Sequence, residues 1–460
     1  MAEIVIIGAG LTGLSAAYNL EANGHLDYEI FEQDSRPGGL LKTESVDNFN
    51  FDYTGHLLHI SNPKFKIFLD TVLNIEQNTI NSKRQSAIFH SNSFALYPFQ
   101  MNLYGLPTDV IYDCINGFIK RKTNIKNPAN FHQWVLKYFG PGLGEHFFFP
   151  YNGKLLSYDV KKILPSWTGR FVPQTNLKLM LNGALQKPAD QNIGYNNSFY
   201  YPKSGGIEFL IKQITSKLNK QIKVNHKAVF VDLKNKTVTF ENGHVEKYDK
   251  LITTMPLKTL LENTPAFKHL SHRLLCSSVI NFNLGFNSPD IGPWHWLYFP
   301  ENRFPFYRLG FWNNISKSCV KPGHTGIYGE TSYLQGTKTQ KQIDKLSERS
   351  VNESLNFLGL TKNNIVVQKN LRLEHAYVIY DYWREKNLNK ILDTLIQSSI
   401  YSVGRFGGWN YSSMQEAFLD GQNVAQRILN EIQAPLCNSY LIKNRQNLSF
   451  EASNFKSKFF

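Results

Sequence analysis

The fold is decided by residues 4–32, which read IVIIGAGLTGLSAAYNLEANGHLDYEIFE. The continuous apolar run at 4–7 predicts a strand buried on both faces of a parallel sheet. Residues 14–20 then predict an amphipathic helix, and residues 28–31 predict a second strand that ends on Glu32. This order of strand, glycine turn, helix, strand and acid is the dinucleotide-binding fingerprint.

Each part of the fingerprint has a physical task. Gly8 makes a tight turn, Gly10 lets the backbone approach a pyrophosphate, and Gly13 lets the helix pack closely on the strand. The N-terminus of the helix then faces the phosphates. Glu32 is expected to accept hydrogen bonds from a ribose.

A glycine pair, Gly38 and Gly39, follows soon after the acid. Nicotinamide and flavin versions of this fold share the first fingerprint, and the added pair favours FAD, since a ligand again meets bare backbone there. Farther along the chain, the backbone near Val229 is expected to reach the adenine side. We therefore predict an FAD-binding Rossmann-like domain.

The composition limits the classes of protein that fit. The 460 residues suggest two or three domains, and 14% of them are aromatic, which suits a large core and aromatic pockets. The net charge of +14 favours anionic partners such as nucleotides, but the cations are spread out, so we expect no nucleic-acid binding. The four cysteines lie far apart and show no metal spacing. With no apolar run near the roughly 18 residues of a membrane span, we expect no transmembrane segment and a cytoplasmic location.

The rest of the chain predicts an α/β fold with three parts. We expect a strand over 49–60, a core-facing helix from Pro107 to Ile119, and a second helix that breaks at GPGLG (140–144). A strand, glycine turn and helix at 400–429 return the chain to its first domain. The predicted parts are an FAD-binding domain (1–95, 204–265 and 395–432), an inserted helical domain (96–190), an antiparallel β-sheet substrate domain (191–203 and 266–394), and a mobile tail (433–460).

Five further stretches are more specific than the fingerprint. They are TGHLLH (54–59), YPFQMN (97–102), PYNGK (150–154), WLYFPENRFPFYR (296–308) and GRFGGWNY (404–411). With these motifs the chain resembles the flavin-dependent UDP-galactopyranose mutases, and the longer eukaryotic-type members more than the short bacterial ones. The resemblance runs over roughly residues 1–430 and places the chain within the FAD-dependent amine oxidase-like superfamily. Leu156 stands where that family tends to carry a tryptophan.

The resemblance implies a role for individual residues. His56 would lie near the flavin N5, and Arg405 would lie against the flavin. The uridine would be held by Tyr97, Phe99, Gln100, Asn152, Trp296 and Tyr298. Arg170 and Arg308 would clamp the two phosphates, Tyr377 and Tyr411 would donate to them, and Asn196 would approach the sugar.

Physical chemistry supports part of this assignment. Guanidinium forks match phosphate oxygens. An unpaired charge at Arg308 in an aromatic strand would be costly, so we expect an anionic ligand there. For Tyr377 and Tyr411, packing in the core with a satisfied hydroxyl remains an alternative.

The implied activity interconverts pyranose and furanose forms of a UDP-hexose through a covalent adduct between flavin N5 and the sugar. It requires reduced FAD, implies NAD(P)H as the reductant, and would serve cell-surface glycan biosynthesis. Oligomerisation is possible. Two alternatives stay open: an amine or protoporphyrinogen oxidase-like oxidoreductase, and a flavoprotein that binds nucleotide sugar without turnover or acts as a basic peripheral scaffold.

Overall fold

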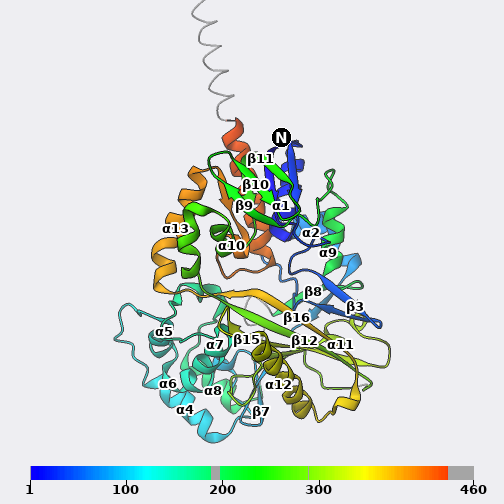
Figure 1. The fold of residues 1–460 in the computed structure, drawn as a ribbon. Coiled ribbons are helices and arrows are strands. Elements are labelled where there is room, and N and C mark those ends of the chain that lie inside the picture. The colour runs from blue at the N-terminus through cyan, green and yellow to red at the C-terminus, as the bar shows by residue number, and fades with distance from the viewer. Residues whose placement is uncertain (1, 188–196, 289, 434–460) are drawn as a thin grey trace, which may run out of the picture.

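The computed structural model describes residues 2–187, 197–288 and 290–433 (Figure 1). It confirms the predicted α/β fold class. Two large sheets lie one above the other, and a group of helices is attached at one side of the lower sheet. The predicted mobile tail beyond residue 433 lies outside the described residues.

The upper sheet holds the dinucleotide fingerprint. Its strand order is β2-β1-β11-β10-β9, with β17 paired to β11. The strands are β1 (Ala2–Ile7), β2 (Tyr28–Phe31), β9 (Ala228–Asp232), β10 (Thr237–Phe240), β11 (Val245–Thr253) and β17 (Ile400–Ser402). The β1–β2, β1–β11 and β11–β17 pairs are parallel. Helix α1 (Leu11–Ala22) packs on this sheet through its buried leucines and alanines.

The lower sheet has seven strands in the order β16-β12-β15-β14-β13-β6-β7. They are β6 (Ser86–His90), β7 (Ser93–Leu96), β12 (Cys276–Phe286), β13 (Trp296–Tyr298), β14 (Arg308–Phe311), β15 (Thr325–Leu334) and β16 (Ile365–Val378). The pairs are antiparallel except for the parallel β13–β6 pair. All of β12 is buried, because α12 (Gln340–Leu358) packs on the sheet from below and other elements cover its opposite face (Figure 1).

The inserted region is helical, as predicted. It contains α4 (Thr108–Ile119), α5 (Phe131–Tyr138), α6 (Gly140–Leu143), α7 (Phe149–Leu156) and α8 (Leu177–Leu185). One detail was predicted wrongly, because Ile119 is 59% exposed rather than in the core. The second helix, α5, ends at Tyr138 just before GPGLG, as predicted. Gly140 (φ +81°) then begins α6 and lets it approach α4 so closely that a Cβ there would lie 2.0 Å from the Gly117 carbonyl oxygen.

Smaller elements connect these parts. They are β3 (Thr43–Val46) paired with β4 (Phe49–Asp52), α2 (Pro63–Leu73), α3 (Ile75–Asn78), β5 (Thr79–Lys83) paired with β8 (Ser198–Pro202), α9 (Glu208–Thr215), α10 (Leu257–Glu262), α11 (Trp312–Ile315), α13 (Tyr382–Gln397), α14 (Gly404–Gly407) and a helix at 414–433.

Two sequence expectations therefore need correction. The strand predicted over 49–60 ends at Asp52, and the chain continues in an irregular segment that carries Thr54 in the left-handed region (φ 74°). Strands β6 and β7 fall almost entirely within the range predicted for FAD binding, yet they pair in the lower sheet. The other domain boundaries stay a prediction.

Candidate active site

One continuous cavity of about 1000 Å³ joins the upper sheet to the lower sheet. Its upper part is lined by the glycine loops that follow β1 and β2. Its lower part is lined by residues of α7, β13, β14 and β15, and by the loop after α14. The cavity therefore brings the dinucleotide fingerprint and the other sequence motifs to one place.

The two glycine motifs touch each other at the upper end. Gly10 and Gly38 form a parallel bridge, and the Gly38 N–H donates to the Ala9 carbonyl at 2.9 Å. A Cβ added to Gly39 would lie 3.3 Å from the Gly10 Cα. The two loops thus form a cradle of bare backbone beside the N-terminus of α1, which fits the pyrophosphate of FAD.

Gly13 has the packing role predicted for it. A Cβ at this position would lie 1.9 Å from the Gly8 carbonyl oxygen, so only glycine lets α1 approach the turn. Gly8 adopts φ +97°, which is the left-handed backbone of a tight turn. Gly404, at the start of α14, packs on Thr12 of α1, which brings the predicted second flavin contact to the fingerprint.

Glu32 lies in the cavity wall, but its carboxylate already accepts two backbone hydrogen bonds. These come from the N–H groups of Ala9 (2.8 Å) and Asp34 (3.0 Å). Burial raises the pKa of Glu32. The carboxylate thus ties the two loops together, and its bond to a ribose stays a prediction. Val229 on β9 also lines this end of the cavity.

His56 lines the middle of the cavity. The tight turn at Thr54 and Gly55 places it, and a Cβ at Gly55 would meet the Tyr328 hydroxyl at 2.1 Å. Burial, followed by the charges of Arg405 and Arg308, lowers the pKa of His56 to about 4. At neutral pH the ring is uncharged, so it can exchange hydrogen bonds with a cofactor but holds no positive charge.

Arg405 on α14 is a cation held by carbonyl groups. Its guanidinium donates to the Ala376 carbonyl at 2.8 Å and to the Ser412 carbonyl, and its Cζ lies 5.5 Å and 5.1 Å from the ring centroids of Tyr377 and Tyr411. Within the part of the chain that the structure describes, it forms no ion pair with a carboxylate. Its positive charge is therefore available to an anionic ligand.

Arg308 lines the cavity, but it is paired within the protein. It stands opposite Glu330 in the β14–β15 ladder, and the two form a bidentate ion pair with Nε–Oε1 at 3.0 Å and Nη2–Oε2 at 2.7 Å. The expectation that Arg308 needs an external anion was therefore wrong. The Nη1 atom of Arg308 makes no hydrogen bond among the described residues, so it can still donate hydrogen bonds to a ligand.

Glu330, which lines the cavity, is a charged residue that the sequence analysis missed. It is fully buried, and it also accepts a hydrogen bond from the Tyr307 hydroxyl. A signal was present, because a carboxylate inside the apolar stretch GIYGETSY requires a buried partner. The pairing partner could not be read from the sequence, since it depends on the strand register.

Most residues predicted to hold the uridine line the lower part of the cavity: Tyr97, Gln100, Asn152, Trp296 and Tyr298. Phe99 is different, because it is fully buried behind Phe147 and stacks on it at 5.1 Å. Phe147 is the ring that faces the cavity. The indole N–H of Trp296 is buried and has no hydrogen-bond partner among the described residues, so it can donate to a ligand.

The lower part of the cavity is rich in phenol groups. Seven tyrosines line it: Tyr97, Tyr151, Tyr298, Tyr307, Tyr328, Tyr377 and Tyr411. Such a wall offers aromatic faces for a base and hydroxyl donors for phosphate or sugar oxygens.

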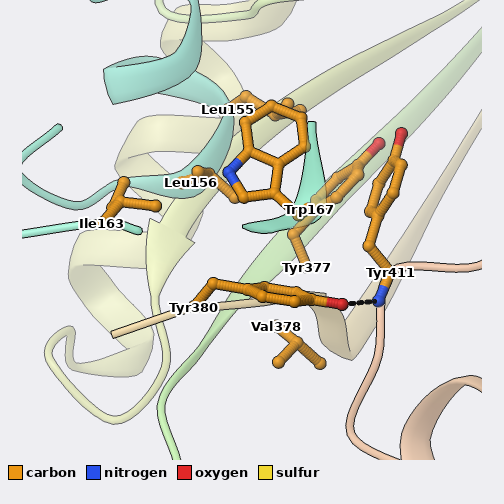
Figure 2. A pocket seen from close by; sticks show the side chains of 8 residues that line it. All are labelled: Leu155, Leu156, Ile163, Trp167, Tyr377, Val378, Tyr380 and Tyr411. Atoms are coloured by element: carbon orange, nitrogen blue, oxygen red, sulfur yellow. Dashed lines mark hydrogen bonds between the residues drawn. The ribbon is translucent and has the colours of Figure 1, made fainter. Parts of the chain in front are cut away.

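A small cavity of about 10 Å³ adjoins this wall (Figure 2). Leu156 lines it together with Trp167, which also reaches the large cavity. Tyr377 and Tyr411 belong to both cavities, and their hydroxyl groups point to the same side (Figure 2). The Tyr411 backbone N–H donates to the Tyr380 hydroxyl at 2.8 Å. The indole of Trp167 thus lines the same small cavity as Leu156, the position where the resembling family tends to have a tryptophan.

Two predicted residues cannot be placed. Asn196 lies outside the described residues, and the side chain of Arg170 is likewise not described. The neighbours of Arg170, Trp167 and Phe171, line the large cavity. Within residues 2–187, 197–288 and 290–433, no group of His, Cys, Asp and Glu could hold a metal ion, and no helix is long and apolar enough to cross a membrane.

The fold and the glycine cradle define a flavin-binding class of protein. The family described as flavin containing amine oxidoreductase matches residues 11–349. The chain therefore belongs to this family of FAD-binding flavoproteins.

Individual relatives differ in how much they share with the chain. A crystal structure of reduced UDP-galactopyranose mutase is 28% identical in sequence, with a TM-score of 0.87 over 94% of both chains. This confirms the resemblance predicted from the motifs. Coproporphyrinogen III oxidase of Staphylococcus aureus (strain NCTC 8325 / PS 47) is 34% identical over 24% of this chain, and that of Bacillus subtilis (strain 168) is 24% identical over 62%. The chain spans 23% and 66% of the lengths of these two oxidases.

Proposed function

We propose that the chain is a flavin-dependent mutase that interconverts the pyranose and furanose forms of a UDP-hexose. The single observation that carries this proposal is the continuous cavity. It joins an FAD cradle to a wall of tyrosines, tryptophans and arginine. The 28% identity to a UDP-galactopyranose mutase over nearly the whole chain supports the same substrate class.

Reduced FAD, when bound, would supply a nucleophilic nitrogen at the anomeric carbon of the sugar. The chain's own residues would position the substrate for this attack and hold the departing anion. Arg308 would offer its free Nη1 to the diphosphate, and Arg405 would add an unpaired positive charge. His56, neutral at pH 7, would exchange a hydrogen bond with the flavin without adding charge.

Different residues of the cavity would bind the uridine and the diphosphate. Trp296 and Tyr298 would contact the uridine together with Tyr97, Gln100 and Asn152. The hydroxyls of Tyr377 and Tyr411 would donate to the diphosphate. The roles proposed for Arg170 and Asn196 rest on the sequence resemblance alone.

The deciding experiment is an anaerobic assay of the FAD-loaded protein with UDP-galactopyranose. With dithionite-reduced flavin we expect a UDP-furanose product by chromatography, formed without stoichiometric use of reductant. NAD(P)H in place of dithionite tests whether it is a competent reductant. Equal turnover with oxidised flavin would contradict the proposal.

A second candidate is an oxidase, which the two coproporphyrinogen III oxidases favour. It predicts that coproporphyrinogen III and oxygen give a fluorescent porphyrin, with hydrogen peroxide formed in step. We expect neither, because a wall of tyrosine hydroxyls and an unpaired arginine suits a sugar diphosphate. Both assays should be run on the same FAD-loaded preparation.

A further inference from the structure

Lys154 is a partly buried cation at the end of the PYNGK motif, and the proposed function assigns it no task. It lies on α7, whose residues Tyr151, Asn152 and Leu155 line the cavity. Within the described part of the chain, it forms no ion pair with a carboxylate. Glu301, the acid whose charge acts on Lys154, is paired with Arg303 instead at 3.0 Å.

The ammonium group of Lys154 is bonded to backbone carbonyls only. Its Nζ donates to the carbonyl oxygens of Phe299 (2.9 Å), Glu301 (2.6 Å) and Phe306 (3.4 Å). All three acceptors belong to residues 299–307, the hairpin loop that joins β13 to β14. Phe299 and Phe306 are themselves fully buried, so two of the three carbonyls that Lys154 satisfies belong to residues with little access to water.

This loop sits between the residues proposed to hold the nucleotide. Trp296 and Tyr298 precede it on β13, and Arg308 follows it on β14. The same strands are tied to each other by the Tyr298–Arg308 pairing. One side chain therefore connects α7 to the hairpin. The two are neighbouring parts of the cavity wall, since the ring centroids of Tyr151 on α7 and Tyr298 on β13 lie 5.5 Å apart.

We infer that Lys154 is a positioning residue, which fixes the β13–β14 hairpin against α7 and so sets where Tyr298 and Arg308 lie relative to Asn152 in the nucleotide site. The inference rests on the proposed function, because the ligand of that site is taken to be a nucleoside diphosphate. A group that ties these two parts of the cavity wall together should affect binding of UDP and leave the FAD cradle on the upper sheet unchanged.

The test compares Lys154→Met with Lys154→Arg and with Lys161→Met, an exposed lysine shortly after the same helix. Burial lowers the pKa of Lys154 to about 7, and the negative charge of Glu301 raises it in part. UDP binding is therefore measured at a pH of about 6, where the ammonium form prevails. Three quantities are measured: FAD per chain, the dissociation constant for UDP by calorimetry, and hydrogen–deuterium exchange of peptides that cover the hairpin loop.

We expect Lys154→Met to keep FAD, to bind UDP at least about tenfold more weakly, and to exchange faster in the hairpin loop. Lys154→Arg, which keeps a cation with N–H donors, should recover part of both effects, and Lys161→Met should match the wild type. Wild-type affinity of Lys154→Met, or weaker binding with an unchanged hairpin loop, would overturn the inference. If Lys154→Met yields no FAD-bound protein, Lys154→Arg decides: faster loop exchange with weaker binding supports the inference, and wild-type values of both overturn it.

The same experiment separates this inference from the proposed function. If the wild-type protein does not bind UDP at all, the proposed function fails. The loop exchange then still reports whether Lys154 holds the hairpin. If the wild type binds UDP and the lysine variants bind it equally well, only the positioning role fails.

Discussion

Arg308 and Glu330 form a buried ion pair, so the stability of the protein should depend on keeping both charges. Arg308→Ala would leave the fully buried Glu330 carboxylate without its cation. We expect the free energy of unfolding in urea to fall by about 3–5 kcal/mol. The control is Arg303→Ala, which breaks the more exposed Arg303–Glu301 pair and should cost about 1 kcal/mol or less. Equal losses in the two variants would contradict the dependence.

A double variant separates stability from binding at this pair. Arg308→Ala combined with Glu330→Gln removes both charges, so most of the lost stability should return. Affinity for UDP should stay roughly ten- to a hundredfold below the wild type, because the donor to the phosphate is still missing. Calorimetric titration of the folded, FAD-loaded double variant checks this. Wild-type affinity would remove Arg308 from the nucleotide site.

His56 predicts a pH dependence of stability. Its pKa is about 4 in the folded protein, against about 6.5 for an unperturbed histidine. Keeping the ring neutral therefore contributes fully to the free energy of unfolding above pH 6.5. As the pH falls toward 4, the unfolded chain binds the proton first, and this contribution is lost by at most about 1.4 kcal/mol per pH unit. In His56→Gln this contribution is absent. The difference in Tm between wild type and variant should therefore shrink from pH 7 to pH 5, whereas a constant difference would show that His56 is not held neutral.

At the scale of elements, glycines decide which helices can approach their neighbours. Gly13 in α1 and Gly153 in α7 are both helical, but a Cβ would lie 1.9 Å from the Gly8 carbonyl oxygen at the first and 4.0 Å from Val160 Cγ1 at the second. We expect Gly13→Ala to lose FAD and lower the Tm. Gly153→Ala should keep FAD and gain up to about 1 kcal/mol, since alanine is the better helix former. FAD content and thermal unfolding of the two variants check this, and a Gly13→Ala protein with full FAD would refute the close-packing argument.

At the scale of the whole molecule, one cavity serves both the cofactor and the proposed substrate. We therefore expect the purified protein to be yellow, to release about one FAD per chain on denaturation, and to change its flavin absorbance when UDP binds. The dissociation constant from absorbance should equal that from calorimetry. Release of NAD alone would contradict the cofactor assignment. A calorimetric UDP signal with no change in the flavin would place UDP elsewhere.

The sequence by itself determined the dinucleotide fold and most of the cavity wall. Residues 4–32 could be interpreted because a buried strand, a glycine turn and an amphipathic helix are local patterns, each set by neighbours a few positions away. The motifs at 97–102 and 296–308 could be assigned to the site only through family resemblance, and most of their predicted ligand contacts do line the cavity. The prediction that Phe99 contacts the ligand was wrong, because a local pattern does not tell which aromatic ring faces the cavity and which packs behind it.

The tertiary structure alone decided how the charges of the site are balanced. Arg308 and Glu330 are 22 residues apart, and the register of β14 on β15 places them opposite each other. Lys154 reaches its acceptors across 145 to 152 residues. Hydrogen bonds form only at donor–acceptor distances of about 3 Å, and the attraction between charges weakens with distance, so the partners depend on which strands and helices meet in space. Sequence patterns determine the elements, whereas the packing of those elements determines which buried charge has a partner and which is left for a ligand.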